Sequence, residues 1–215
     1  MLSNLLFAVC PKVIALIIGA YYYRYLSTPF RLILGIVLLG ALTETGAFLY
    51  NLTLHISNAW IFNIYMISEF GLYCAAVWYF FPANIRKLVP VIFIADFSVW
   101  VYQIARHSVF EFSIISLITG ALLISVLYFV VLVLNILHSD QALSKNPLFW
   151  LSVSILLYYV CGIPAMSTIT EQIDAYVHKR VNIPMININN LLNATSNLLT
   201  GYCFYLLGKQ KQLPL

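Results

Sequence analysis

Long apolar stretches, separated by short polar segments, run through the whole chain. Most of them contain about 20 residues, the length that an α-helix needs to cross the hydrocarbon core of a bilayer. Hydrophobic positions are continuous within each stretch, which excludes the alternating strands of a membrane β-barrel. The sequence therefore predicts an all-α membrane protein: a single domain over 1–215, without a soluble domain, with seven transmembrane helices over 2–23, 30–54, 59–81, 86–105, 110–137, 147–169 and 184–207.

Residues at the ends of the stretches support these boundaries. Three consecutive tyrosines, 21–23, form an aromatic cluster of the kind found at the lipid–water interface. Pro147 and Pro184 stand at the first turns of the last two stretches, where proline is well tolerated. Gly208 is predicted to end the last helix. Pro164 is predicted to kink or break the sixth helix.

The distribution of Lys and Arg predicts the orientation of the bundle. Basic residues concentrate on the cytoplasmic side of a membrane protein. An N-terminus outside the membrane and a C-terminus in the cytoplasm place seven basic residues on the inner side and four at or near the outer side. The inner group is Arg24, Arg31, Arg86, Lys87, Lys145, Lys209 and Lys211, and the outer group is Lys12, Arg106, Lys179 and Arg180.

Composition agrees with a membrane location and excludes other classes of protein. Hydrophobic residues make up 62% of the chain and charged residues 8%, whereas soluble domains carry roughly 25% charged residues. The net charge of +4 comes from scattered residues without a basic cluster, so no nucleic-acid partner is expected. The four cysteines show no C-x-x-C spacing, which argues against a zinc or redox motif.

Three acidic residues fall near the middle of predicted spans. They are Glu44 in the second, Glu69 in the third and Asp96 in the fourth. An ionisable group at that depth costs about 3 kcal/mol on the translocon scale. Such groups usually face the interior of the bundle and mark functional sites. We therefore expect these three acids to point inward, towards a shared polar cavity.

Helical spacing assigns companions to two of the acids. Tyr65 and Tyr73 lie four residues before and after Glu69, and therefore on its face. Asn51 shares a face with Glu44, together with small residues that allow a neighbouring helix to approach closely. These polar side chains are predicted to line the cavity.

The last span is rich in asparagine. Steps of three and four residues place Asn190, Asn193 and Asn197 on one face. Asparagine amides both donate and accept hydrogen bonds. The ladder therefore suits either a wet cavity or a hydrogen-bonded interface between helices, and both interpretations remain open. The same holds for the acids, which either hold helices together or bind a cation, a proton or a small ligand.

Lys12 is the one basic residue that falls well inside a predicted span and not at its first residues. If the first helix begins near residue 2, Lys12 lies deep in the bilayer and is a charge partner for Glu44 or Glu69. If the helix begins near Pro11, the lysine extends to the outer surface instead. The sequence favours the surface position.

Other chemistry receives little support from the sequence. His55, His107 and His178 fall at the predicted outer side, but no metal-binding spacing joins them, and whether they converge is left open. No nucleophile elbow, phosphate loop or catalytic dyad is present, so no catalytic residue and no cofactor are predicted. The last span has no lysine for a retinal Schiff base.

Three segments resemble an uncharacterised group of seven-helix membrane proteins from Bacteroidota that are often encoded beside sensor histidine kinases. They are Leu42-Thr43-Glu44, Ile64-Tyr65-Met66-Ile67-Ser68-Glu69-Phe70 and Asn146-Pro147-Leu148-Phe149-Trp150, and the asparagine-rich last helix is similar too. The resemblance implies a bacterial inner-membrane location, a sensory role and a histidine kinase as partner. Glu44 and Glu69 coincide with acidic positions of that group, whereas Asp96 and Lys12 have no match in it.

Taken together, the sequence favours a non-enzymatic membrane protein with a polar cavity that recognises a small molecule, an ion or a lipid and serves in sensing. Its signal is expected to reach a partner through the helices or the inner loops. The alternative is a small transporter or channel that uses the intramembrane carboxylates, and an intramembrane enzyme is a third and weaker interpretation.

Overall fold

The computed structural model describes residues 2–54, 58–167 and 184–212, and within these ranges the chain is helical, without a strand. Apolar runs of this length form helices because every backbone N–H and C=O group can then be paired within the segment. The α-helices are α1 (Leu2–Tyr21), α2 (Thr28–Leu54), α3 (Ala59–Phe80), α4 (Leu88–His107), α5 (Ile114–His138), α6 (Pro147–Ser167) and α8 (Pro184–Gln212), and short 3-10 turns cover Tyr23–Tyr25 and Leu143–Lys145.

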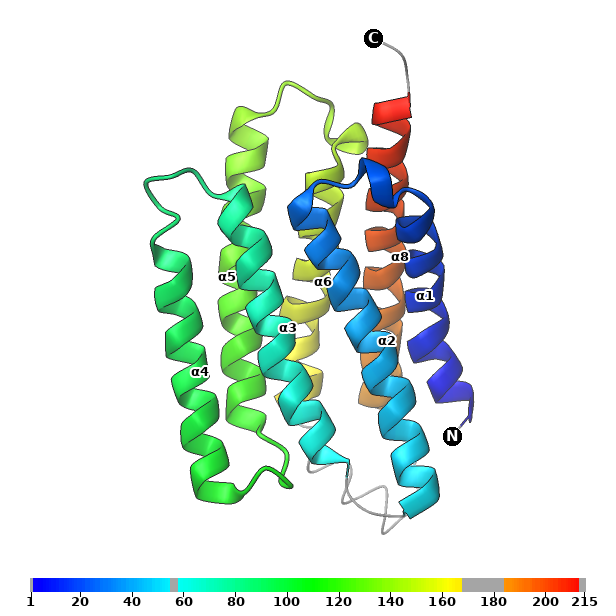
Figure 1. The fold of residues 1–215 in the computed structure, drawn as a ribbon, viewed down its shortest axis with the longest axis vertical. Coiled ribbons are helices and arrows are strands. Elements are labelled where there is room, and N and C mark those ends of the chain that lie inside the picture. Colours follow the sequence, from blue (N-terminus) through cyan, green and yellow to red (C-terminus); the bar gives the residue numbers. More distant parts are fainter. Residues whose placement is uncertain (1, 55–57, 168–183, 213–215) are drawn as a thin grey trace.

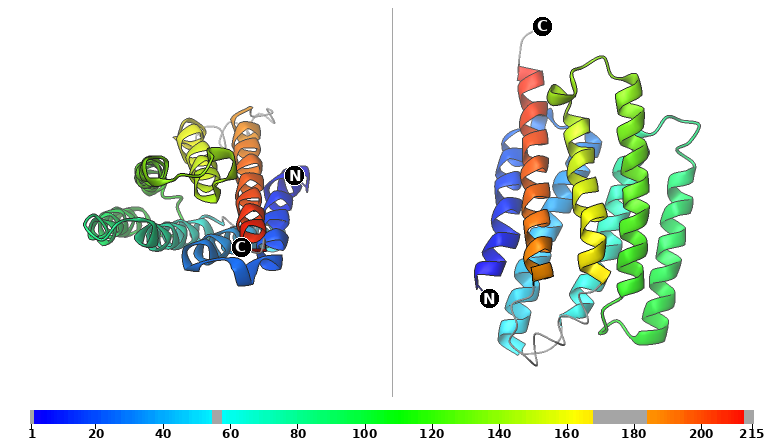
Figure 2. Two further views of the ribbon diagram at one scale, coloured as in Figure 1. Left: turned by 90° about the horizontal axis from the view of Figure 1, so that it is seen from above. Right: turned by 180° about the vertical axis from the view of Figure 1, so that it is seen from behind.

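The helices form a ring, with one helix packed outside it. Going round the ring, α1 contacts α2, α2 contacts α3, α3 contacts α5, α5 contacts α6, α6 contacts α8, and α8 closes onto α1. The outer helix, α4, packs against α3 and α5 alone among the major contacts and stands at the edge of the bundle (Figures 1 and 2). Helix α1 begins at one end of the bundle and α8 ends at the opposite end (Figure 1). Because α8 contacts α1, the first and last described helices are neighbours in space.

Five of the described helices, α2 to α6, are long and apolar enough to cross a membrane. Their outward faces carry many exposed large hydrophobic side chains, including Leu42, Val91, Ile115, Phe129 and Val160. A surface of this kind is unfavourable in water but suits lipid. The all-helical prediction is confirmed for the described residues, and the length and composition of these helices are compatible with a membrane protein. Helix α8 is the most polar of the described helices.

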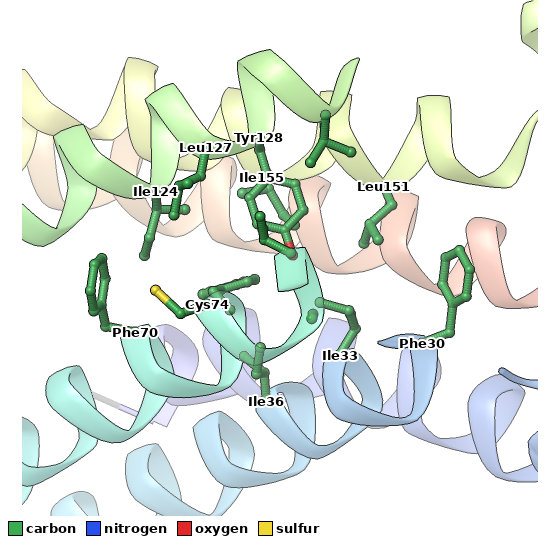
Figure 3. Close-up of a cluster of buried hydrophobic side chains, with 14 of the residues drawn as sticks. Phe30, Ile33, Ile36, Phe70, Cys74, Ile124, Leu127, Tyr128, Leu151 and Ile155 are labelled. Atoms are coloured by element: carbon green, nitrogen blue, oxygen red, sulfur yellow. The ribbon is translucent and has the colours of Figure 1, made fainter. Parts of the chain in front are cut away.

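Apolar packing fills the half of the bundle nearer the C-terminus. Side chains from α2 and α3 face those of α5 and α6 across a common interior, which Figure 3 shows in close-up. Tyr128 and Phe204 are fully buried there. The labelled members of this cluster in Figure 3 are Phe30, Ile33, Ile36, Phe70, Cys74, Ile124, Leu127, Tyr128, Leu151 and Ile155.

The prediction that the last helix ends at Gly208 is wrong, because α8 continues to Gln212. The sixth helix is not broken at Pro164, since α6 continues through it to Ser167. Gly208 serves packing instead. A Cβ atom at this position would lie 2.0–2.5 Å from the ring of Tyr22, which follows α1. The glycine therefore lets α8 pass close to the segment that leaves α1.

We expect Gly208→Ala to destabilise the protein by about 1–3 kcal/mol, because the added methyl group forces the buried Tyr22 ring to move. Gly35→Ala is the matched control, since no atom lies within 4 Å of a Cβ at that helical position. The melting temperature of the purified protein in detergent checks both. Equal effects of the two substitutions would contradict the close packing at Gly208.

The connection between α4 and α5 is tied to α3 by Asn63, which is fully buried. Its Nδ2 donates to the carbonyl oxygens of Val109 and Glu111 at 2.8 and 2.7 Å, and its Oδ1 accepts from the backbone N–H of Ser113 at 3.1 Å. Three backbone groups that have left the helices are satisfied in this way. Helix α5 therefore begins at Ile114, four residues later than predicted.

Asn63→Ala should cost about 2–3 kcal/mol of stability, because it removes three hydrogen bonds and leaves their backbone partners unpaired. Asn58→Ala is the control on the same helix end, with one side-chain hydrogen bond, to the carbonyl oxygen of Ala47 at 3.2 Å. It should cost about 1 kcal/mol. Chemical or thermal unfolding in detergent measures both, and a neutral Asn63→Ala would exclude the anchoring role.

Candidate functional site

A pocket of about 210 Å³ lies inside the ring, in the half that the apolar cluster does not fill. Side chains from α1, α2, α3, α6 and α8 line it, with two more from the beginning of α5 and the residues before it. Its polar lining comprises Lys12, Glu44, Tyr65, Glu69, Tyr73, Tyr158, Tyr159, Asn189, Asn190, Asn193, Ser196, Asn197 and Thr200. Two of the three predicted acids and most of the predicted asparagines and tyrosines therefore meet in one place.

An ion pair between Lys12 and Glu44 crosses from α1 to α2 inside this pocket. The lysine side chain is 7% exposed and that of the glutamate 21%. The prediction that Lys12 extends to the outer surface is wrong, because α1 begins at Leu2 and continues through Pro11. The lysine thus sits midway along the helix, and the alternative prediction of a charge partner for Glu44 describes its position.

Asparagines on α8 extend the ion pair into a hydrogen-bonded chain. Asn193 Nδ2 donates to Glu44 Oε1 at 3.3 Å, on the same oxygen that Lys12 Nζ contacts. Asn197 Nδ2 donates in turn to Asn193 Oδ1 and to its carbonyl oxygen, both at 2.8 Å. The face predicted for the asparagine ladder is the one turned inward, and the chain joins α1, α2 and α8.

Glu69 is held by its neighbour one turn away. Tyr65 Oη donates to Glu69 Oε1 at 2.7 Å, as their spacing on α3 suggested. Gly40 of α2 makes room for this pair, since a Cβ atom there would lie 3.0 Å from Tyr65 Oη and 3.2 Å from Lys12 Cε. The polar side chains of α1 and α3 therefore meet over a glycine of α2.

Tyrosine rings separate the pocket from the apolar cluster. Tyr73 packs edge to face against Tyr159 and Tyr128, with ring centroids 5.8 and 5.5 Å apart. Tyr73 and Tyr159 belong both to the pocket lining and to the apolar cluster. The sequence pattern predicts Tyr73 as a lining residue of the pocket but not Tyr158 and Tyr159. The sixth apolar stretch contains no acidic residue that would indicate which of its faces points inward.

Two predicted residues lie outside the pocket. Asn51 is exposed near the end of α2, so its assignment to the cavity is wrong. It shares a face with Glu44 but lies two turns further along, where its side chain is exposed. Asp96 is buried at 2% exposure but borders a separate small void beside the pocket, together with Glu69. It lies apart because α4 packs outside the ring.

The pocket contains polar oxygen atoms without hydrogen-bond partners. Glu44 Oε2, Asn189 Oδ1 and Tyr159 Oη are all buried and unpaired in the described structure. The first two are acceptors only. Buried acceptors of this kind are costly unless a donor reaches them. The arrangement therefore suits a bound species that donates hydrogen bonds or carries a positive charge.

The predicted outer histidines form no site that the structure describes. His107 is exposed, with Nδ1 3.8 Å from a carboxylate oxygen of the equally exposed Glu111. His55 and His178 lie outside the described residues. Across the described ranges there is no group of three or more His, Cys, Asp or Glu side chains that could hold a metal ion.

Comparisons of the chain with protein-family models, with curated proteins and with solved structures gave no match. The function therefore has to be argued from the geometry of the pocket itself.

A double-mutant cycle tests whether Lys12 and Glu44 act as a pair. Lys12→Met leaves a buried carboxylate without its cation, which should cost about 3 kcal/mol. The double variant Lys12→Met/Glu44→Gln removes both charges and should be more stable than Lys12→Met alone, with a coupling energy of about 1–3 kcal/mol. Unfolding in detergent measures all four proteins.

Lys87→Met, at an exposed lysine before α4, is the control and should leave stability unchanged. If the effects of Lys12→Met and Glu44→Gln on stability were additive, the lysine and the glutamate would stabilise the bundle independently.

Proposed function

We propose that this chain is a multi-pass protein of the bacterial inner membrane that recognises a small, positively charged polar ligand in its central pocket and serves as a sensory module. The supporting observation is the set of buried oxygen acceptors without donors that lines the pocket, Glu44 Oε2 above all. Two carboxylates against one ammonium group leave the pocket with an excess of negative charge when all three are ionised.

The proposed topology has seven spans, with the N-terminus outside. The described helices alternate in direction along the chain (Figure 1), and an odd number of spans places the chain ends on opposite sides. Basic residues at the proposed inner side lie over aromatic rings, as Arg31 does over Tyr23 at 4.8 Å and Arg86 over Trp78 at 5.7 Å. Such pairs are typical of the interfacial region.

The pocket favours a ligand of modest size. A volume of about 210 Å³ is below the roughly 300–1,000 Å³ of sites for drug-sized molecules. Its tyrosine rings present faces that attract cations, and its amides can donate to a second polar group of the ligand. A primary or quaternary amine with a short polar tail combines these features.

Sensing is favoured over conduction by the packing beyond the pocket. A channel needs a continuous polar path, whereas the cluster around Tyr128 and Leu127 fills the other half of the bundle with buried apolar side chains. A ligand recognised at this depth would act on helix packing, and the resemblance to proteins encoded beside histidine kinases suggests a kinase as the recipient of the signal. A bound ligand would brace α1, α2, α3 and α8 together.

A transporter is the second candidate. The ion pair between Lys12 and Glu44, next to the acid Glu69, is an arrangement that could exchange protons with a bound solute. Closure on one side, as the apolar cluster provides, is also one state of an alternating-access cycle. Measurement of transport separates the two candidates.

The test compares ligand binding with flux in the same preparation. We expect ethanolamine or choline to raise the melting temperature of the protein in detergent, and acetate at the same concentration to leave it unchanged. A shift of about 3 °C corresponds to a tenfold excess over Kd for a chain of this size. Glu69→Gln keeps the volume of the side chain and removes its charge. It should lower the apparent affinity for the amine at least tenfold and thereby reduce the shift in melting temperature.

The control is Glu111→Gln, at an exposed acid outside the pocket, which should behave as wild type. Proteoliposomes loaded with radiolabelled choline or ethanolamine supply the second measurement. A sensor should release no label beyond the rate of empty vesicles. Flux that disappears in Glu69→Gln would replace the sensory proposal with transport, and amines without effect on melting would contradict the proposed ligand class.

A further inference from the structure

Asp96 is a buried acid that the central pocket does not use. It lies in the middle of α4 and is 2% exposed, and its Oδ1 has no hydrogen-bond partner within the described structure. Its two carboxylate oxygens lie over Gly120 of α5, at 3.5 and 3.7 Å from the place that a Cβ atom would take there. An isolated carboxylate at this depth is among the costliest groups that a protein can bury.

A void of about 20 Å³ adjoins this carboxylate. That is enough for one particle of the size of a water molecule, which needs roughly 10–15 Å³ of the same measure. Four helices contribute oxygen-bearing side chains to its lining: Glu69 from α3, Asp96 from α4, Ser116 from α5 and Tyr159 from α6. The void adjoins the larger pocket, since Met66, Glu69, Leu117 and Tyr159 border both, but Asp96, Ser116 and Gly120 line the void and not the pocket.

The charges around the void are one-sided. Two carboxylates line it and no basic side chain does, because Lys12 lies in the neighbouring pocket, bound to Glu44. Two unpaired polar groups, Asp96 Oδ1 and Tyr159 Oη, belong to side chains that are 2% and 3% exposed. A positive ion would compensate both the charge and the missing hydrogen bonds.

The ligand set indicates which kind of ion fits. Carboxylate and hydroxyl oxygens are ligands for hard cations. Cysteine and histidine are missing from the lining, and the thioether of Met66 is the one sulfur group that borders it. The described ranges contain no group of three acids, histidines or cysteines of the sort that holds a divalent metal. The room for one particle and the small number of charges are appropriate to a monovalent ion.

We propose that the void between α3, α4, α5 and α6 is a binding site for a single sodium ion, with Asp96 as its principal ligand and Glu69, Ser116 and Tyr159 completing the oxygen shell. The ion neutralises Asp96 and ties the outer helix α4 to the ring. The assignment of this sodium site does not depend on which molecule the central pocket recognises, or on whether that pocket serves sensing or transport.

Thermal unfolding in detergent tests the site. At constant pH and ionic strength, replacing caesium chloride, whose cation is too large for the void, with sodium chloride should raise the melting temperature of the wild-type protein. A rise of about 3 °C is expected when sodium exceeds Kd tenfold. Potassium, which is larger, should give a smaller rise. Binding of radioactive sodium, displaced by unlabelled sodium chloride, measures the same event without unfolding the protein.

Two substitutions identify the site. Asp96→Asn should abolish both the shift and the radioactive binding. Gly120→Ala keeps the acid but places a methyl group against its carboxylate at an ordinary contact distance, so it should weaken sodium binding at least tenfold while the protein still folds. Asp140→Asn, at an exposed acid in the connection after α5, should leave sodium binding unchanged.

Other results would overturn the proposal. Equal melting in sodium and caesium, with no radioactive binding, would show that no sodium ion binds at Asp96. A sodium response that survives both Asp96→Asn and Gly120→Ala would place the ion elsewhere.

Discussion

The ion pair between Lys12 and Glu44 is the interaction on which the rest of the structure depends. It joins α1 to α2, and Asn193 brings α8 onto the same carboxylate. These are the helices that close the ring, and α8 is its most polar member in the described residues. Apolar packing against lipid supplies little preference for one neighbour over another, because lipid tails are as apolar as leucine. A buried charge that can be satisfied in only one arrangement selects that arrangement.

The pair also explains why the bundle has two unlike halves. Lys12 and Glu44 need polar neighbours, and the asparagines of α8 and the hydroxyl groups of Tyr65 and Ser196 gather around them. Beyond the tyrosine layer the helices pack mainly through aliphatic and aromatic side chains. Tyr73 can stand at this boundary because one end of a tyrosine is apolar and the other polar. The pocket thus lies in the polar half of the bundle, where the side chains fill the interior less densely than the apolar side chains fill the other half.

The sequence predicts the helices well because the length of an apolar run and its flanking prolines are local properties. It also predicts that Glu44 and Glu69 face inward, since a charge exposed to lipid is too costly. It does not predict which inward faces meet. Asp96 points inward as expected, but α4 stands outside the ring, and this depends on contacts between helices that no local pattern encodes. Asn51 lies on the same face of α2 as Glu44, but two turns away from it and outside the pocket. Gly208 looks like the end of a helix until the ring of Tyr22 is placed beside it.

Glu69 occupies a special position, because its carboxylate borders both the central pocket and the void at Asp96. A cation in either place would draw on the same negative charge, and two cations near one carboxylate repel each other strongly where water is excluded. If both proposed sites bind cations, occupation of one must weaken the other, and by the same factor in each direction, since a coupling free energy is reciprocal. Tyr65, which donates to Glu69 from one side, limits how far the carboxylate can turn towards either site. A single glutamate would then let the sodium content of the surroundings set the sensitivity of the pocket to its ligand.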